Sequence, residues 1–272
     1  MTFLLKLNKK KALRLTCIFT CLLIFLCVVN PIDSYGQRRP GRLGDYKKRL
    51  EEKEFMVGVE GVLGLSLLSQ TKINQWLEAE NSVPSNPLKP EKPYIGLSGF
   101  MIYNRYVLGL DAGRLWRSAS TSTGVDAEYS GNMIFANLGY ILVREENGRG
   151  YPYLGIGLGS SSINLNNHMD EPFLFGEGDP ILSPPNTTGK LKFNTFLIQG
   201  GYQLIRTFPL SGTRIKQKGI HFSLKAGFIL GLGGNKWELN GVELTDSPKA
   251  SFNQVYARLT IGGWYSKIFE KE

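Results

Sequence analysis

Apolar and polar residues alternate along most of the chain beyond residue 53. In the segment 219–231, every second residue from Ile220 to Leu230 is apolar, and the residues between them are polar or glycine except for Ile229. Alternation with a period of two is typical of a β-strand, because successive side chains point to opposite faces. Segments of this kind predict eight strands: Glu54–Ser69, Pro93–Tyr103, Tyr106–Ser118, Glu128–Val143, Tyr151–Leu165, Lys190–Thr207, Gly219–Gly231 and Ser251–Ser266.

The polar faces of these strands distinguish a membrane barrel from a soluble one. They are rich in Gly, Ser, Asn and Gln and carry few charges. In a membrane barrel the apolar face contacts lipid and the interior is polar. The pattern therefore predicts an all-β fold, an eight-stranded antiparallel up-and-down transmembrane β-barrel over residues 54–269. A soluble, lipocalin-like carrier is the alternative.

The few charges of the polar faces are of both signs. In a small closed interior such charges must pair, because removing an ion from water is costly. We therefore expect structural ion pairs in the lumen, and the first and last strands of a closed barrel are neighbours, which makes Glu60 and Arg258 the preferred pair. The residues expected in these lumen pairs are Glu60, Asp111, Lys225 and Arg258.

The connections between the predicted strands alternate in length. Those at 70–92, 119–127, 166–189 and 233–250 are long, whereas 104–105 and 144–150 are short and 208–218 is intermediate. The short connection 144–150 contains Asn147-Gly148, a dipeptide that favours hairpin turns. Outer-membrane barrels have short periplasmic turns and long outer loops, so both termini are predicted to be periplasmic.

Aromatic residues stand near the predicted periplasmic end of every strand. Aromatic girdles form at membrane interfaces because the ring prefers the boundary while its polar edge stays wet. The residues predicted for this girdle are Phe55, Tyr103, Tyr106, Tyr140, Tyr151, Tyr202 or Phe208, Phe222, and Trp264 with Tyr265.

The N-terminal residues 1–36 have the order of a secretory signal peptide. Five basic residues precede an apolar run of 15 residues from Leu15 to Val29, and small residues follow at Ser34 and Gly36. The run is short for a membrane helix, which needs about 20 residues. An uncleaved anchor helix and a lipoprotein signal are the alternatives. Residues 37–53 are predicted to be a basic periplasmic leader, and the protein is predicted to lie in a bacterial outer membrane.

Removal of the signal changes the chemistry of the chain. All three cysteines, Cys17, Cys21 and Cys27, lie in the signal, so the mature chain would carry no thiol. The signal also holds +4 of the formal net charge of +9, and residues 37–54 hold another +3. The basic character therefore belongs to export and to the leader, and nucleic-acid binding is discarded despite a high pI.

One short motif is a candidate for catalysis. His221 and Ser223 stand two residues apart on a predicted strand, so they share a face as a base and a nucleophile must. The motif resembles the His-x-Ser dyad of the outer-membrane lipid A deacylases. The family pattern has Asn and Ala after the serine, whereas this chain has Leu224 and Lys225, and the motif lies at the predicted periplasmic end. We expect no catalytic residues, no metal site and no cofactor.

The pattern over residues 54–269 resembles the eight-stranded outer-membrane barrels of the OmpX and OmpA class. It is similar to the outer-membrane β-barrel domain proteins of Bacteroidota, which include PorT-like members. The features that carry the resemblance are Tyr35-Gly36-Gln37 at the end of the signal, the Gly-rich strand from Tyr153 to Gly159, and Gly262 to Tyr265 with Phe269 near the terminus.

The expected function is that of a non-enzymatic outer-membrane barrel, a structural or accessory component acting through its extracellular loops or its leader. A lipid A-modifying enzyme and a PorT-like secretion or envelope-assembly factor are the alternatives, and a narrow pore is disfavoured because side chains fill an eight-stranded lumen. The expected partners are outer-membrane lipid and lipopolysaccharide, and a protein through loop 166–189 or leader 37–53.

Overall fold

The structure is a computed structural model. It describes residues 53–68, 74–75, 88–121, 125–145, 147–168, 188–213, 215–232, 236–239, 241–244 and 252–269. The chain divides into two units, 1–51 and 52–272, and these residues all belong to the second. The predicted signal, the leader up to residue 52 and most of loop 166–189 lie outside the described residues. No helix within the described ranges is long and apolar enough to span a membrane.

Eight long strands follow the predicted alternation closely. Three short strands lie between them: β5 (Val143–Arg144), β9 (Glu238–Leu239) and β10 (Val242–Glu243). The long strands are β1 (Lys53–Leu68), β2 (Glu91–Tyr103), β3 (Tyr106–Thr121), β4 (Val125–Tyr140), β6 (Gly148–Asn167), β7 (Thr188–Gly212), β8 (Lys216–Leu232) and β11 (Gln254–Phe269).

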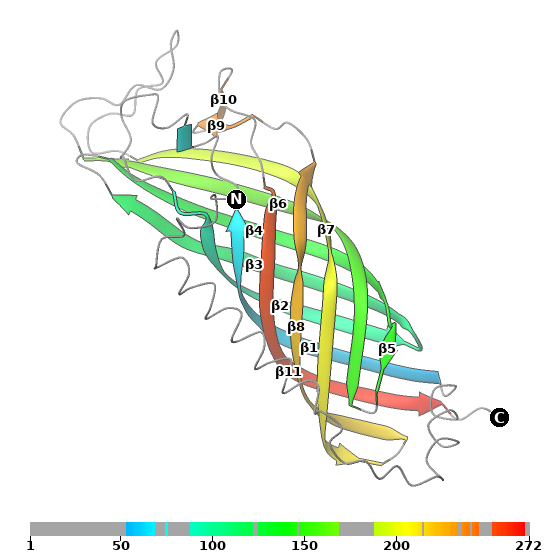
Figure 1. The fold of residues 1–272 in the computed structure, drawn as a ribbon. Coiled ribbons are helices and arrows are strands. Elements are labelled where there is room, and N and C mark those ends of the chain that lie inside the picture. The colour runs from blue at the N-terminus through cyan, green and yellow to red at the C-terminus, as the bar shows by residue number, and fades with distance from the viewer. Residues whose placement is uncertain are drawn as a thin grey trace, which may run out of the picture. The chain divides into compact units, whose positions relative to one another are not determined.

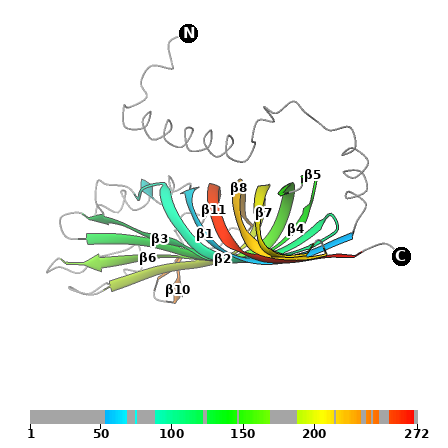
Figure 2. The same cartoon turned by 90° about the horizontal axis from the view of Figure 1, so that it is seen from below.

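The eight long strands close into a ring. Each pairs antiparallel with the next along the chain, and the last strand, β11, pairs with β1 over residues 254–269 and 53–68. The strands tilt and curve around a common axis (Figures 1 and 2). The fold is an eight-stranded antiparallel up-and-down β-barrel, as the sequence predicts.

The register fixes how strongly the strands tilt. Hydrogen-bonded partners followed once around the ring lead from Gly58 on β1 through every strand to Leu68 on β1, ten residues farther along. With eight strands and ordinary strand spacings, this stagger corresponds to a tilt of about 40°. Such a barrel has an interior that side chains can fill.

The two ends of the barrel differ in their connections. At the end that holds Lys53 and Phe269, β2 and β3 meet at a tight turn in which Asn104 has a φ of 57°, and β7 and β8 meet at Thr213–Ile215.

Two of the predicted connections are longer than those in the structure. The long loop expected at 119–127 shrinks to 122–124 and the segment expected at 208–218 shrinks to three residues, because the flanking strands continue pairing past the predicted ends.

A small hairpin covers part of the far end. Strand β7 begins eight residues before its pairing with β8, so residues 188–195 have no partner on β8. Strand β9 pairs with this part of β7, with Leu239 opposite Leu191. Trp237, just before β9, packs edge-on against Phe193, with ring centroids 4.6 Å apart.

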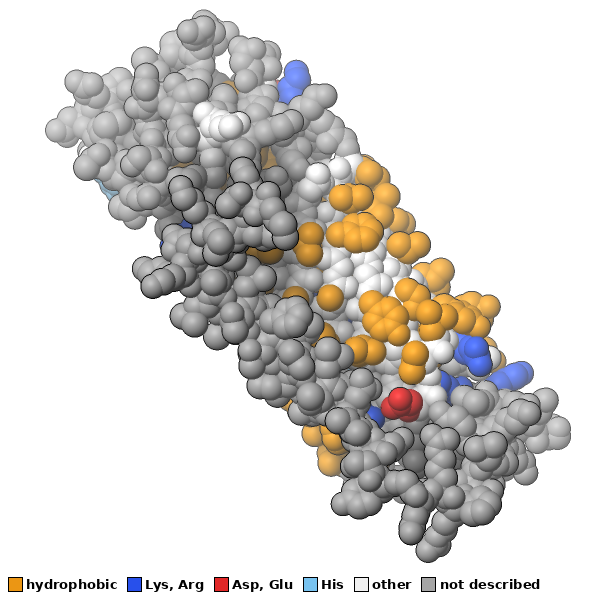
Figure 3. All heavy atoms as spheres, viewed as in Figure 1, with side chains coloured by type: hydrophobic (Ala, Val, Ile, Leu, Met, Phe, Trp, Pro, Cys, Tyr) orange, Lys and Arg blue, Asp and Glu red, His pale blue; other side chains and the backbone are white. Residues whose placement is uncertain are grey.

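The two faces of the sheet differ in polarity. The outward face presents a band of exposed aliphatic and aromatic side chains, which spans the middle of the strands in Figure 3. At the end with the short turns, outward rings pack edge-on in pairs, Tyr106 with Tyr140 and Phe208 with Phe222. Two residues predicted for this girdle, Tyr151 and Trp264, are buried, because they occupy positions of the inward face.

Candidate functional site

The inward face forms a polar lumen, and a lysine lies at its centre. The ammonium of Lys225 on β8 lies 2.9 Å from Asp111 Oδ1 on β3 and 3.3 Å from Glu60 Oε1 on β1. It also donates a hydrogen bond of 3.2 Å to Ser98 Oγ. All three charged side chains are buried. One cation therefore serves two carboxylates from distant strands across the barrel.

A chain of hydrogen bonds extends from Glu60. Its Oε2 contacts His221 Nε2 at 2.9 Å and accepts a hydrogen bond of 2.6 Å from Thr260 Oγ1. Thr260 is 2.6 Å from Ser223 Oγ, which accepts from Gln203, which in turn accepts from the Tyr151 hydroxyl. This chain links β1, β11, β8, β7 and β6 and gives partners to the buried polar side chains that it contains.

A second chain extends from Asp111. Asn137 Nδ2 donates to Asp111 Oδ2 at 2.8 Å, and the Gln199 amide donates to Asn137 and, at 3.5 Å, to the same carboxylate oxygen. Tyr256 donates to Gln199 Oε1 at 3.5 Å and is hydrogen-bonded to Tyr153. Together with Ser98 on β2, which accepts a hydrogen bond from Lys225, the two chains connect side chains of all eight long strands.

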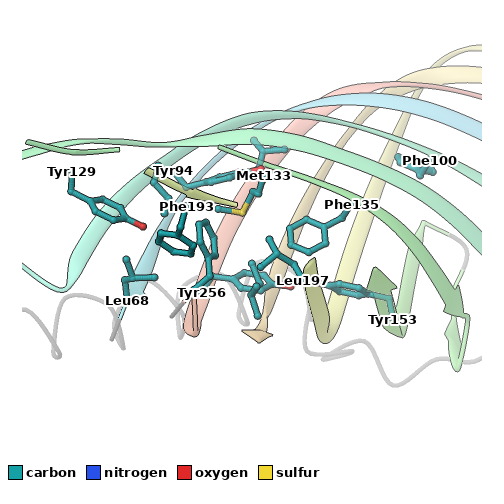
Figure 4. Packing of buried hydrophobic residues seen from close by; sticks show 14 of the residues in the cluster. Leu68, Tyr94, Phe100, Tyr129, Met133, Phe135, Tyr153, Phe193, Leu197 and Tyr256 are labelled. Carbon is teal, nitrogen blue, oxygen red and sulfur yellow. Dashed lines mark hydrogen bonds between the residues drawn. The ribbon is translucent and has the colours of Figure 1, made fainter. Parts of the chain in front are cut away.

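Arg258 does not join the carboxylates. Its guanidinium carbon lies 3.9 Å from the Tyr94 ring centroid and 4.1 Å from that of Tyr256 (Figure 4 labels both rings). The expected pair of Glu60 with Arg258 is not made: β1 and β11 are indeed neighbours, but the register places Arg258 opposite Gly64, whereas Glu60 lies opposite Gly262. The four predicted lumen residues thus separate into a triad, Glu60–Lys225–Asp111, and an arginine held between aromatic rings.

Two inward glycines make room for this arrangement. A Cβ on Gly64 would lie 2.7 Å from Arg258 Cγ and 2.5 Å from the Ala257 carbonyl oxygen. A Cβ on Gly113 would lie 2.2 Å from the Tyr94 hydroxyl oxygen. Arg258 therefore crosses β1 over Gly64, and Tyr94 lies across β3 over Gly113.

His221 and Ser223 are held in separate interactions. The Nε2 of His221 contacts Glu60, and its Nδ1 has no hydrogen-bond partner in the described part of the chain. Ser223 contacts Thr260 and Gln203 instead. Both residues are buried in the lumen, at the part of β8 closer to the short turns. The shared face that the sequence predicted is present, but no hydrogen bond joins the two residues.

A further charge cluster lies at the end of the lumen that holds the short turns. Glu54 on β1 is buried and binds two arginines: Arg144 Nη2 at 2.8 Å, and Arg149 on β6. No local sequence pattern reveals this cluster, because 90 or more residues separate Glu54 from each arginine. Its only local signal was that Glu54 shares the inward parity of Met56 and Glu60.

The opposite half of the lumen is mostly apolar and aromatic. Leu68, Tyr129, Phe193, Leu197 and Phe252 are buried there, and Figure 4 shows Tyr129 and Leu68 at the end of the cluster far from Phe100. Tyr129 is also 2.7 Å from Ser161 Oγ. Among the described residues, no three His, Cys, Asp or Glu side chains are placed to hold a metal ion.

The outward face carries a groove between β4, β6 and β7. It has a volume of about 580 Å³ and lies where the face changes character. Ile134, Leu158 and Phe196 form an apolar row across the three strands, and the next outward row is Asn132, Ser160 and Asn194.

No family model and no curated protein match the chain. Solved structures do match. Ail, the attachment invasion locus protein of Yersinia pestis, has 10% identity and a TM-score of 0.37, covering 79% of this chain and 99% of Ail. Neisserial surface protein A has 12% identity and a TM-score of 0.36, covering 78% of this chain and 96% of that protein. The outer membrane protease OmpT from Escherichia coli has 9% identity and a TM-score of 0.28, covering 80% of this chain and 97% of OmpT. Because these values are low, the fold class rests on the closed register of the chain itself.

Proposed function

We propose that this protein is a non-enzymatic barrel of the bacterial outer membrane that serves as a structural or accessory component. The observation that carries the proposal is the combination of an apolar outer band with a polar lumen, in which Lys225 pairs with Glu60 and Asp111. A sheet with this polarity is stable where lipid covers the outside, since exposed bands of this size are rare on soluble monomers.

Membrane placement has a direct test. The full chain should fractionate with outer membranes, resist extraction by carbonate and urea, and migrate on gels at a different apparent mass when unheated. A soluble carrier would appear in the soluble fraction and show no heat-dependent shift, which would refute the placement.

The orientation belongs to the same proposal. The short turns lie at the same end of the barrel as its first and last residues, Lys53 and Phe269, which supports a periplasmic location for this end. An epitope inserted at residues 122–124 should then be accessible on intact cells, and one at Thr213 should not. The reverse labelling pattern would overturn the orientation and with it any role for the leader 37–53 in the periplasm.

A closed lumen is a consequence of the proposed role. Lys225, Glu60 and Asp111 bridge opposite walls, and the two hydrogen-bond chains fill the cross-section between them. We expect the purified protein to show no steady conductance in planar bilayers. Regular, long-lived conductance steps would support the pore alternative instead.

The enzymatic alternative concerns His221 and Ser223. Their separate hydrogen bonds to Glu60 and Thr260 support a structural role. We expect lipid A from cells that express the wild-type protein to keep the acyl composition of the empty-vector control. A loss of acyl chains that disappears in Ser223→Ala would establish the enzyme. Membership among the Bacteroidota barrels, including a PorT-like role in secretion, remains a proposal from sequence resemblance.

Lipid is the partner for which the outer surface offers a specific place. The groove beside Ile134, Leu158 and Phe196 has an apolar wall that suits an acyl chain, and Asn132 and Asn194 border it with amides that suit a lipid's polar linkage. A protein partner acting through loop 166–189 or leader 37–53 is also part of the proposal; capture from detergent-solubilised outer membranes tests it.

A further inference from the structure

Positive charge is in excess in the outer half of the lumen, the half away from the short turns. In the half near the short turns, Glu54, Glu60 and Asp111 each contact a basic side chain. The outer half holds two more buried cations, Arg258 at 1% and Lys92 at 0% exposure, and no carboxylate of the described residues forms an ion pair with either. A buried cation without a counter-charge is costly, so its environment needs an explanation.

Arg258 is partly stabilised by its surroundings. The rings of Tyr94 and Tyr256 face its guanidinium, and cation–π contacts of this kind are favourable when desolvated. Its Nη2 contacts Met133 Sδ at 3.6 Å, but its Nε has no hydrogen-bond partner among the described residues. The rings therefore offset part of the desolvation and leave the net charge in place.

Lys92 on β2 has less support. Its ammonium lies 5.0 Å from the Tyr129 ring centroid, and it forms no hydrogen bond within the described part of the chain. A single aromatic face replaces few of the three hydrogen bonds that an ammonium makes in water.

Other unsatisfied polar groups lie next to Lys92. Ser66 on β1 is the cross-strand partner of Lys92, and Gln254 on β11 lies opposite Leu68, two residues farther out on β1. Both side chains are buried, and the Ser66 hydroxyl and both polar atoms of Gln254 have no partner in the described structure. Ser66 and Lys92 are directly opposed, about 5 Å apart, and Ser66 and Gln254 are diagonal neighbours about 7–8 Å apart, so the long side chains of Lys92 and Gln254 can converge over Ser66.

We infer that Lys92, Ser66 and Gln254 form a binding site for an oxyanion at the outer end of the lumen. The ammonium supplies the counter-charge, and the hydroxyl and the amide NH2 supply hydrogen bonds to the oxygens of a phosphate, sulfate or carboxylate group. Arg258 deepens the positive potential behind it. The site takes either a free oxyanion or the anionic end group of a larger molecule.

Calorimetric titration of the folded full chain in a non-ionic detergent tests this site. The probes are inorganic phosphate and glucose 1-phosphate, each against chloride at equal ionic strength. We expect saturable binding, with tighter binding of the sugar phosphate if the natural ligand is an end group and of inorganic phosphate if it is a free ion. Absence of binding of both probes at about 20 mM, well above a millimolar dissociation constant, would overturn the inference.

Variants separate the site from general surface charge. Lys92→Met should weaken binding by about tenfold or more, and Ser66→Ala by about fivefold, as expected for hydrogen bonds to a charged and a neutral donor. Lys190→Met removes the same charge from the outward face of β7 and should leave the affinity unchanged. Equal affinities of Lys92→Met, Lys190→Met and wild type would mean adventitious ion binding only. If Lys92→Met fails to fold, Ser66→Ala keeps the inference testable, because equal affinities of Ser66→Ala, Lys190→Met and wild type would overturn it.

Discussion

The buried cations have different partners in the two halves of the lumen. In the half near the short turns, Lys225 and the two arginines at Glu54 face carboxylates at ion-pair distance. In the outer half, Arg258 and Lys92 face aromatic rings. The first half is neutralised by the chain itself, and its groups depend on one another. The second half retains charge that the described chain does not neutralise.

The comparison separates two roles for buried charge. Removing one member of a hydrogen-bonded ion triad leaves the others buried and uncompensated, which is far more costly than the loss of a contact. Removing a cation that has no carboxylate partner leaves nothing uncompensated. Replacing a buried cation by Met should therefore lower the free energy of unfolding much more in the half near the short turns than in the outer half.

The largest effect is expected for Lys225→Met. It leaves Glu60 and Asp111 buried without their shared cation, so the free energy of unfolding should fall by about 3–5 kcal/mol. Urea titrations in detergent or lipid vesicles, followed by tryptophan fluorescence and gel mobility, measure the change. Lys218→Met, which removes an exposed lysine from the same strand, should stay within about 0.5 kcal/mol of wild type. A loss for Lys225→Met no larger than that of Lys218→Met would contradict the assigned ion triad.

A smaller effect is expected at the glycine over which Arg258 crosses. In Gly64→Ala the new Cβ meets the Ala257 carbonyl oxygen at 2.5 Å and Arg258 Cγ at 2.7 Å, so backbone or arginine must move. Overpacking of this kind costs about 1–3 kcal/mol. Gly61→Ala on the same strand is the matched control, because its Cβ has no atom nearer than the Ile261 carbonyl oxygen at 3.9 Å. The same unfolding titrations compare the pair, and equal stabilities would show that Arg258 takes another path.

The sequence predicted the strands well because a membrane barrel imposes the alternation of period two along its whole lipid-covered length. Outside that length the signal fades. Residues 119–121 and 125–127 continue β3 and β4, yet the sequence predicts a loop there, because Ser, Thr and Gly dominate residues 118–124. Parity alone would have placed Tyr151 and Trp264 inside, since they share the faces of Tyr153 and Thr260.

The candidate site was less accessible to sequence reasoning. Four charged lumen residues were found from parity, but their partners depend on the ten-residue stagger of the ring, which no local pattern reveals. Adjacency of β1 and β11 suggested Glu60 with Arg258, whereas Lys225 reaches Glu60 across β11. Lys92 was missed because the predicted strand began one residue after it.

The smallest effect, and the sharpest test of the comparison, is expected for Arg258→Met. This side chain is as deeply buried as Lys225, but its loss removes two cation–π contacts while also removing the cost of enclosing an unpaired charge. These contributions oppose each other, so the stability should stay within about 1 kcal/mol of wild type. Combined with Lys225→Met, its effect should be larger than alone, because Asp111 interacts electrostatically with both cations and would then lose both. A loss near that of Lys225→Met would mean that Arg258 neutralises a carboxylate. The cations of both halves of the lumen would then be stabilised by carboxylates.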